Sequence, residues 1–260
     1  MTATYLDRIL AAHRATAAAD SRDPEELRSA CRDLAPCRNF RGALEAPGLS
    51  VIAEVKRRSP SKGDLAADLD PAEVARAYAE GGAGCLSVLT DVDHFGGSAE
   101  DLQVARAAVD LPVLRKDFTV AINDVFDARL MGADCVLLIV AALDDDDLAT
   151  FSEAAADVGL ASLFEIHDEA ELERALAVDA QIIGVNQRDL VTFEVDQQRA
   201  VRMAPQIPAD RVRIAESGVR GPADASVLWQ AGYDAVLVGE SVVTAAGRSD
   251  AVRALRAVSG

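Results

Sequence analysis

The stretch VIAEVKRRSPSKG, residues 51–63, joins an apolar segment directly to charged residues and a turn. Its β-branched and apolar residues predict a strand, and Ser-Pro-Ser-Lys-Gly predicts the turn that ends this strand. Glu54 and Lys56 stand where the two meet. We interpret the stretch as a buried strand that carries ionisable side chains at its carboxyl end.

The same unit recurs along the rest of the chain. Short apolar runs lead through a turn into a helical pattern, which opens with Pro or Asp and closes on Gly, as helices do. Eight such runs occur, at residues 49–55, 85–89, 111–116, 135–140, 161–166, 182–186, 212–217 and 235–239. Apolar strands that alternate with helices predict a parallel sheet covered on its faces.

The number of units predicts how the sheet is arranged. Eight units within about 210 residues fit an α/β fold, a single (β/α)8 TIM barrel over residues 49–260. A doubly wound open sheet is the alternative, but no G-x-G-x-x-G follows the first strand. Residues 1–48 contain two helical patterns, 5–19 and 24–34, and then a loop over 35–48. We expect them to form an N-terminal helical extension packed on the barrel.

Composition and charge restrict the function. The chain has 260 residues, half of them hydrophobic, and a net charge of −17, which disfavours a nucleic-acid partner that needs a cationic face. The four cysteines lack metal-type spacing and are expected to be reduced. An apolar signal segment and a run of 18 apolar residues are both missing, so we expect a cytoplasmic protein without a membrane partner. A monomer is the working expectation for its oligomeric state.

Ionisable and amide side chains gather at the predicted strand ends. Because alternate residues of a strand share a face, Glu54 and Lys56 follow the apolar Ile52 on one side of the first strand. The residues found at such ends are Glu54, Lys56, Lys116, Glu165, Asn186, Arg188 and Glu216. In a barrel they would meet in one pocket, where neighbouring charges adjust pKa values for acid and base work. The alternative is a set of structural salt bridges that close the barrel mouth.

Lysine usage supports proton transfer. Only three of the 26 basic residues are lysine, namely Lys56, Lys62 and Lys116, and the others are arginine. Arginine cannot lose its proton at useful pH, whereas lysine can be adjusted to do so. Two of the three lysines fall at predicted strand ends, where a proton donor would be placed.

Small, glycine-rich turns after three strands predict a phosphate site. Backbone N–H groups after strands seven and eight are the usual phosphate seat of this barrel. The residues of these turns are Ser59, Ser61 and Lys62 after strand one, Ser217 and Gly218 after strand seven, and Gly239, Glu240 and Ser241 after strand eight. We therefore expect a phosphorylated small-molecule substrate.

No metal site is predicted. The acidic run 144–147 begins a helical pattern, where the helix dipole favours acids. His13, His94 and His167 share no spacing that would suggest zinc.

Taken together, the motifs resemble one enzyme family. IAEVKRRSPSKG, FGGS, PVLRKDF, GADCVLLIVAAL, FEIHDEAEL, IGVNQRDLVTFEVD, IAESGV and VLVGES occur in the same order in indole-3-glycerol phosphate synthases. The resemblance implies a barrel enzyme that cyclises 1-(2-carboxyphenylamino)-1-deoxyribulose 5-phosphate with loss of CO2 and water. It implies no cofactor and no metal. His94 and Gln187 depart from the residues that are usual in the family.

The resemblance also implies roles for individual residues. Lys116 matches the general acid that acts on the ketose carbonyl oxygen, and Glu165 and Glu54 match carboxylates of the later proton transfers. Lys56 matches a lysine with a binding or an acid role. Residues that match substrate contacts are Phe95, Asn186, Glu216 and Ser217. From their chemistry, we expect Arg188 and Lys56 to hold the carboxylate, Ser59 to lie at the phosphate edge, and the phosphate to bind at Gly218, Gly239, Glu240 and Ser241.

Three other functions remain open from the sequence. A related ribulose-phosphate isomerase would share the phosphate loops but would not need two strand-end lysines. A Schiff-base aldolase would use Lys116 as its nucleophile. A non-catalytic binding barrel would tolerate loss of Lys116 or Glu165, and both are present.

Overall fold

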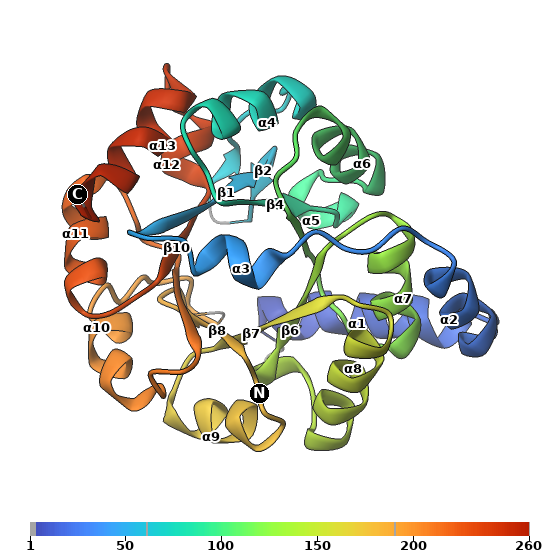
Figure 1. The fold of residues 1–260 in the computed structure, drawn as a ribbon. Coiled ribbons are helices and arrows are strands. Elements are labelled where there is room, and N and C mark those ends of the chain that lie inside the picture. The colour runs from blue at the N-terminus through green and yellow to red at the C-terminus, as the bar shows by residue number, and fades with distance from the viewer. Residues whose placement is uncertain (1–3, 61, 190, 260) are drawn as a thin grey trace.

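The computed structural model describes residues 4–60, 62–189 and 191–259, so Ser61 lies outside the described residues. Eight parallel strands close into a barrel in the order β1-β10-β9-β8-β7-β6-β5-β4 (Figure 1). The prediction of a (β/α)8 barrel is confirmed. The open-sheet alternative is wrong, because β1 pairs with both β10 and β4 and leaves no free edge in the barrel.

The barrel strands lie where the apolar runs predicted them, with ends that differ by at most two residues. They are β1 (Ser50–Val55), β4 (Cys85–Leu89), β5 (Val113–Lys116), β6 (Cys135–Ile139), β7 (Ala161–Ile166), β8 (Ile182–Asn186), β9 (Val212–Glu216) and β10 (Ala235–Val238). A short hairpin, β2 (Arg58–Ser59) and β3 (Gly63–Asp64), follows the first strand.

Helices cover the outside of the barrel. The longer ones are α4 (Pro71–Glu80), α6 (Ala99–Ala108), α7 (Ile122–Leu130), α8 (Asp145–Asp157), α9 (Glu169–Ala177), α11 (Pro222–Gln230) and α13 (Arg248–Arg256). Shorter ones are α5 (Val92–Phe95), α10 (Arg199–Met203), α12 (Glu240–Val243) and the 3-10 turns η1 (Val140–Ala142), η2 (Ala204–Gln206) and η3 (Ala257–Ser259). The acidic run begins α8 as predicted, with Asp144 accepting the N–H of Asp147.

Alternation along the strands divides the core into two parts. Ile52, Leu114, Leu163 and Ile214 are fully buried inside the barrel, in a cluster separate from the one between strands and helices. Because side chains alternate, the residue two positions further along each of these strands also faces the barrel axis. This places ionisable side chains in a layer above the apolar interior.

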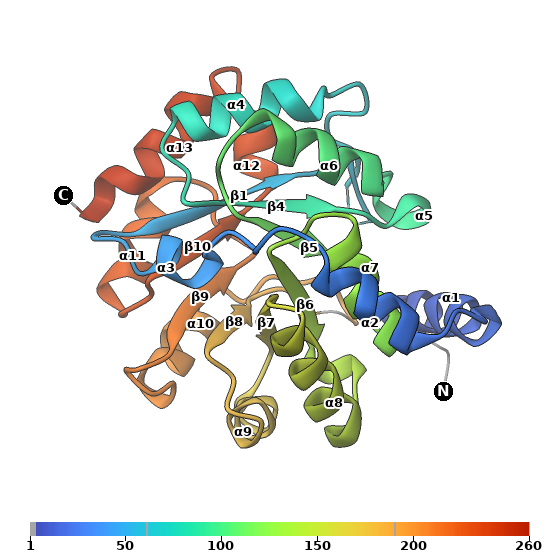
Figure 2. The same cartoon turned by 45° about the vertical axis from the view of Figure 1, so that its right-hand side comes forward.

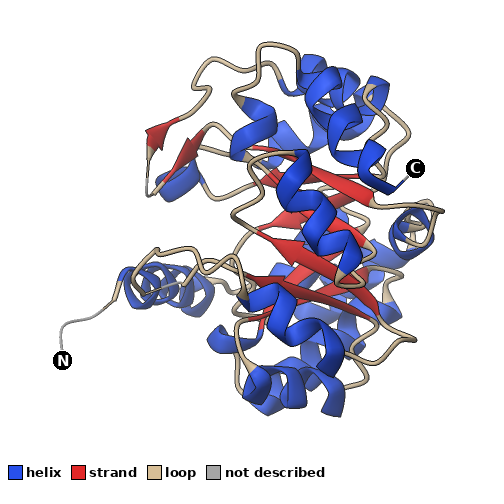
Figure 3. Ribbon diagram, turned by 90° about the vertical axis from the view of Figure 1, so that its left-hand side faces the viewer, coloured by secondary structure: helices blue, strands red, loops and turns tan. Residues whose placement is uncertain are grey.

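The N-terminal extension contacts both ends of the barrel. It contains α1 (Tyr5–Ala19), α2 (Pro24–Arg32) and α3 (Phe40–Leu44). Figure 1 shows α3 across the near end, with α1 behind the barrel, and Figure 2 shows α2 beside α7. In the side view, α1 and the β2–β3 hairpin project from the same end (Figure 3).

The prediction of a loop over residues 35–48 is wrong in part, because α3 forms within it. The side chain of Asn39 accepts the N–H of Gly42 and so caps the first turn. Phe40 and Leu44 are buried against the interior cluster, which they close at the amino ends of the strands. Tertiary packing therefore stabilises a five-residue helix that has no helical periodicity of its own.

Within the part of the chain that the structure describes, no helix is both long enough and apolar enough to cross a membrane.

Candidate active site

A cavity of about 630 Å³ opens at the carboxyl ends of the barrel strands. Every described residue that the sequence proposed for the site lines it. These residues are Glu54, Lys56, Ser59, Phe95, Lys116, Glu165, Asn186, Arg188, Glu216, Ser217, Gly218, Gly239, Glu240 and Ser241. The barrel thus brings together residues that are spread over most of the sequence.

The end of β1 supplies an ion pair. Lys56 Nζ lies 2.5 Å from Glu54 Oε1, and the hydroxyl of Ser87 donates to Glu54 Oε2 at 3.3 Å. Glu54 is almost wholly buried, whereas Lys56 is partly exposed to the cavity. Gly239 packs against this pair so closely that a Cβ at this position would overlap the Glu54 carboxylate. A larger residue directly after β10 would therefore displace the ion pair.

A second charged group lies across the barrel from the first. Lys116 Nζ donates to Glu165 Oε2 at 2.7 Å and lies 3.6 Å from Glu216 Oε2. Asn186 Nδ2 donates to the other oxygen, Glu165 Oε1, at 3.0 Å. Glu165 and Glu216 are each only 1% exposed, and Glu216 Oε1 is buried without a hydrogen-bond partner among the described residues. This oxygen lies against Gly184, where a Cβ would overlap it, so the Glu216 carboxyl group is buried in the wall of the cavity.

The protonation states of this group follow from burial and charge. Burial raises the pKa of Glu216 well above its usual value, more than Lys116 lowers it. Burial also opposes ionisation of Glu165, but Lys116 and then His167 lower its pKa below the usual value. For Lys116, burial lowers the pKa, but Glu165 and Glu216 outweigh burial and raise it. The resting site thus holds an ammonium, an ionised Glu165 and a Glu216 that favours its neutral form.

The turns after β9 and β10 form one wall of the cavity. Ser217 and Gly218 both have left-handed backbones, with φ of 66° and 74°. Their carbonyl groups accept hydrogen bonds from Gln187 Nε2 and Gln197 Nε2, each at 2.7 Å. The Ser241 hydroxyl donates to the Val219 carbonyl at 2.8 Å and joins the two turns. These bonds fix the backbone of the two turns where it lines the cavity.

Two ionisable residues at the rim have protein partners. The carboxylate of Glu240 accepts from Lys62 Nζ at 2.6 Å, so its backbone rather than its side chain is available to the cavity. Glu240 is the first residue of α12, whose first N–H groups have no partner within the helix. The guanidinium of Arg188 donates to the Phe193 carbonyl at 2.9 Å.

The structure adds residues that the sequence analysis missed. Tyr5, Leu6 and Ile9 of α1 line the cavity, as do Asp91 and Phe118. The spacing of Tyr5, Leu6 and Ile9 is that of one apolar helix face, but nothing in the sequence says what this face covers. Asp91 could have been identified from the sequence, because it is a polar residue just after the second predicted strand.

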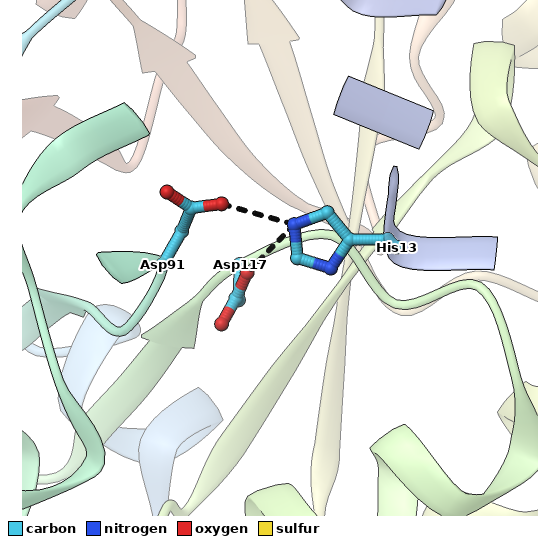
Figure 4. Close-up of side chains that lie close together, drawn as sticks. All are labelled: His13, Asp91 and Asp117. Carbon is cyan, nitrogen blue, oxygen red and sulfur yellow. Dashed lines mark hydrogen bonds and ion pairs between the residues drawn. The ribbon is translucent and has the colours of Figure 1, made fainter. Parts of the chain in front are cut away.

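His13 of α1 meets two carboxylates at the cavity edge (Figure 4). Its Nε2 lies 3.0 Å from Asp91 Oδ2 and 3.9 Å from Asp117 Oδ1. The three ligand atoms lie within 4.8 Å of one another, an arrangement that the spacing of the histidines did not suggest. Protein donors already occupy both carboxylates, however. The N–H groups of His94 and Phe95 bind Asp91, and Arg115 donates to Asp117 at 3.0 Å. These donors favour an ion-paired clamp over a metal site.

Known proteins resemble this chain over nearly its whole length. The family model for indole-3-glycerol phosphate synthase matches residues 6–255. The protein of that name from Nocardioides sp. is 53% identical over 233 residues, which cover 90% of each chain. The one from Mycolicibacterium smegmatis is 49% identical over 253 residues, 96% of this chain and 93% of its own. Indole-3-glycerol phosphate synthase 1 of Streptomyces coelicolor is 52% identical over 220 residues, 85% of this chain and 82% of its own.

A solved structure supports the architecture. Thiamine phosphate pyrophosphorylase from Pyrococcus furiosus superposes with a TM-score of 0.62, covering 85% of this chain and 98% of its own. Its sequence is 17% identical, so the likeness concerns the barrel fold alone. The family match and the relatives at about half identity are far more specific, and from them the chain belongs to the indole-3-glycerol phosphate synthase family.

Proposed function

We propose that the chain converts 1-(2-carboxyphenylamino)-1-deoxyribulose 5-phosphate to indole-3-glycerol phosphate, CO2 and water by general acid and base catalysis. Membership in the family makes it a carboxy-lyase of tryptophan biosynthesis. The observation that best supports the mechanism is the Lys116 ammonium, which lies between Glu165 and Glu216 at the barrel end. The ammonium is a proton donor, and a carboxylate that can take up a proton lies beside it.

The proposed chemistry uses these groups in sequence. The aromatic carbon that carries the carboxylate bonds to the ketose carbonyl carbon, while Lys116 gives a proton to the carbonyl oxygen. The bond to the carboxylate then breaks and CO2 leaves, which restores the aromatic ring. Glu165 next takes a proton from the methylene carbon. Glu54 passes a proton from the adjacent Lys56 ammonium to the departing hydroxyl, which leaves as water. The carbonyl oxygen thus receives two protons from the enzyme, and the methylene carbon gives one proton back to the enzyme.

Substrate binding is assigned to the remaining residues of the cavity. Arg188 and Lys56 would hold the carboxylate through charge-assisted hydrogen bonds. Phe95 would lie beside the aromatic ring, and Asn186, Glu216 and Ser217 would position the sugar chain. The phosphate would bind the N–H groups around Gly218, Gly239, Glu240 and Ser241, with Ser59 at its edge. The joined turns after β9 and β10 support this assignment.

Two further parts of the proposal concern the whole chain. An active monomer is also proposed, because the barrel closes within one chain. Cys31, Cys37, Cys85 and Cys135 are all free, which supports a cytoplasmic location.

The geometry argues against a Schiff-base aldolase. A nucleophilic lysine must be neutral, and such lysines have lowered pKa values. Here Glu165 and Glu216 raise the pKa of Lys116 despite its burial. Borohydride in the presence of substrate should therefore leave the mass of the protein unchanged, whereas a trapped adduct on Lys116 would favour the aldolase.

The direct test is to incubate the purified chain with the carboxyphenylamino-deoxyribulose phosphate and to follow indole fluorescence. We expect fluorescent product, with release of one CO2 per indole. A folded protein that forms no indole would overturn the proposed function. Lys116→Met, measured under the same conditions, controls for spontaneous cyclisation.

A further inference from the structure

Phe193 lies after β8 and has a backbone conformation that few aromatic residues adopt. Its φ is 61°, in the left-handed region, where a Cβ crowds the following carbonyl oxygen. Among the described residues, Asp179 and Ser217 are the other non-glycine residues with positive φ. Asp179 follows the end of α9, where left-handed residues are common, and Ser217 belongs to the turn after β9. Phe193 needs an explanation of its own, because glycine would adopt this conformation without strain.

Hydrogen bonds hold this part of the chain in a tight turn. Arg188 and Val195 form an antiparallel bridge. Between them, the N–H of Asp189 donates to the Glu194 carbonyl and the N–H of Phe193 donates to the Asp189 carbonyl, each at 2.9 Å. The surrounding turn thus fixes the left-handed backbone of Phe193.

The carbonyl of Phe193 holds a residue of the proposed site. Arg188 Nη1 donates to this carbonyl at 2.9 Å, and among the described residues the guanidinium makes no other hydrogen bond. Arg188 is partly buried and lines the cavity, so its remaining N–H groups can bind a carboxylate there. The direction of the guanidinium therefore depends on where the Phe193 carbonyl points.

The ring of Phe193 contacts the first turn of α1. It lies 5.2 Å from the ring of Tyr5, centroid to centroid, and the two ring planes meet at 69°. Edge-to-face pairs of this kind are favourable beyond the area that they bury. Both residues line the cavity. Phe193 thus contacts α1 through its ring and Arg188 through its backbone.

We propose that Phe193 is a positioning residue with two separate roles. Its left-handed backbone aims Arg188 at the substrate carboxylate, and its ring keeps Tyr5 of α1 at the cavity. The inference rests on the proposed function, because the carboxylate that Arg188 would hold is the group lost as CO2. The substrate carries this carboxylate and indole-3-glycerol phosphate does not. The backbone of Phe193 should therefore affect binding of the substrate alone, whereas its ring should affect binding of both compounds.

The test separates the backbone of Phe193 from its ring. Phe193→Gly removes the ring but retains the left-handed backbone, so KM and the inhibition constant of indole-3-glycerol phosphate should both rise about three- to ten-fold. Phe193→Val removes the same ring, but a β-branched residue disfavours positive φ. Its inhibition constant should match that of Phe193→Gly, while its KM should be about ten-fold higher still, the effect of one hydrogen bond to a charged group. In both variants kcat should stay within about three-fold of wild type, because Lys116 and Glu165 keep their own hydrogen bond.

Further variants check that the backbone acts through Arg188. In an Arg188→Gln background, Phe193→Gly and Phe193→Val should have the same KM. Phe193→Tyr keeps the ring and should restore substrate binding to within about two-fold of wild type. Val191→Ala is the matched control, because it shortens an exposed side chain of the same segment. If Phe193→Val does not fold, Phe193→Ala replaces it, with a KM about three- to five-fold above that of Phe193→Gly.

A double-mutant cycle tests the ring contact. Tyr5→Ala and Phe193→Gly together should raise the inhibition constant of indole-3-glycerol phosphate by less than their separate effects multiplied, because each removes the same contact. Independent effects would overturn the role of the ring. An equal ratio of KM to inhibition constant in Phe193→Gly and in Phe193→Val, or in Phe193→Ala if that variant is used, would overturn the role of the backbone. Absence of product from the wild-type chain would instead overturn the proposed function.

Discussion

At the scale of single residues, the site is set by the neighbours of Lys116. The side chain is buried beside Glu165 and Glu216, and Glu54 also raises its pKa. A buried ammonium without such partners would lose its proton, whereas this one keeps it at neutral pH. The resting enzyme is therefore ready to give a proton, and the consequence can be tested by substitution.

Lys116→Arg separates proton donation from positive charge. If Lys116 only attracted anions, arginine would serve, since the chain uses it for 23 of its 26 basic residues. A guanidinium does not give up its proton, so we expect turnover to fall about 100-fold or more, close to Lys116→Met. Binding of a product analogue, measured for both variants, should remain near normal. Retention of more than about a tenth of wild-type turnover by Lys116→Arg would exclude an obligatory acid role.

Glu165→Gln tests the partner carboxylate. The amide oxygen can still accept a hydrogen bond from Lys116 or from Asn186, but not from both, and the amide cannot take up a proton. We expect turnover to fall by about 10²- to 10⁴-fold while substrate affinity changes only a few-fold. Single-turnover rates and the dissociation constant of a product analogue provide the two measurements. Collapse of affinity with turnover of bound substrate intact would instead make Glu165 a binding residue.

At the scale of elements, α1 is attached to the cavity edge through His13. The hydrogen bond to Asp91 raises the pKa of His13 above its usual value, more than burial lowers it, and Asp117 and Asp124 add to the rise. Because the pKa of His13 is higher in the folded protein, the protonated histidine stabilises the fold. This stabilisation is complete below the pKa of about 6.5 that histidine has in the unfolded chain. The contribution is lost as pH rises through the folded pKa.

His13→Gln should therefore lower stability in a pH-dependent way. We expect a loss of about 1 to 2 kcal/mol at about pH 5.5, from one charge-assisted hydrogen bond at a partly exposed site. The difference from wild type should shrink toward about pH 8.5, as the pH passes the raised pKa and the histidine loses its proton. Urea unfolding at both pH values measures it. A difference that is equal at the two values would show that the imidazolium does not hold α1.

The turns after β9 and β10 form a second element-level unit. Gly218, Gly239 and Ser241 lie along one wall, and the Ser241 hydroxyl joins the two turns. We expect inorganic phosphate or sulfate to bind there and to compete with substrate. Gln197→Ala removes the bond to the Gly218 carbonyl and should raise the inhibition constant of phosphate about five- to ten-fold. Crystals soaked in sulfate that show the anion only elsewhere would contradict the assignment.

At the scale of the whole molecule, the barrel and α1 make separable contributions. The closed strand order does not include the N-terminal extension, and α1 buries only Ile9 and Leu10 deeply. Deletion of residues 1–20 should therefore leave the barrel folded, with stability lower by about 3 to 6 kcal/mol. It also removes Tyr5, Leu6 and Ile9 from the cavity wall, so KM should rise at least about ten-fold.

Circular dichroism, thermal unfolding and steady-state kinetics of the deletion variant check this expectation. A variant without ordered secondary structure would show that the barrel cannot close without α1. An unchanged KM would show that α1 is not part of the substrate site.

The sequence by itself determined the eight strand–helix units and the charges at their ends. Both are local properties, since a strand is recognised by its apolar run and the face of Glu54 or Lys116 by alternation with its neighbours. The α3 helix was missed because burial of Phe40 and Leu44, rather than periodicity, stabilises it. The periodicity of the sequence likewise indicates an apolar face on α1, but it does not show which part of the barrel this face covers.

Tertiary structure alone decided which of these charges become partners. Lys116 and Glu165 are 49 residues apart and His13 and Asp91 are 78 apart, and only closure of the barrel brings each pair within hydrogen-bond distance. The protonation states depend on burial as well as on partners, so Glu216 favours its neutral form although its sequence context resembles that of any strand-end glutamate. Burial and pairing across the barrel are properties of the assembled fold, because they arise between segments that no local pattern connects.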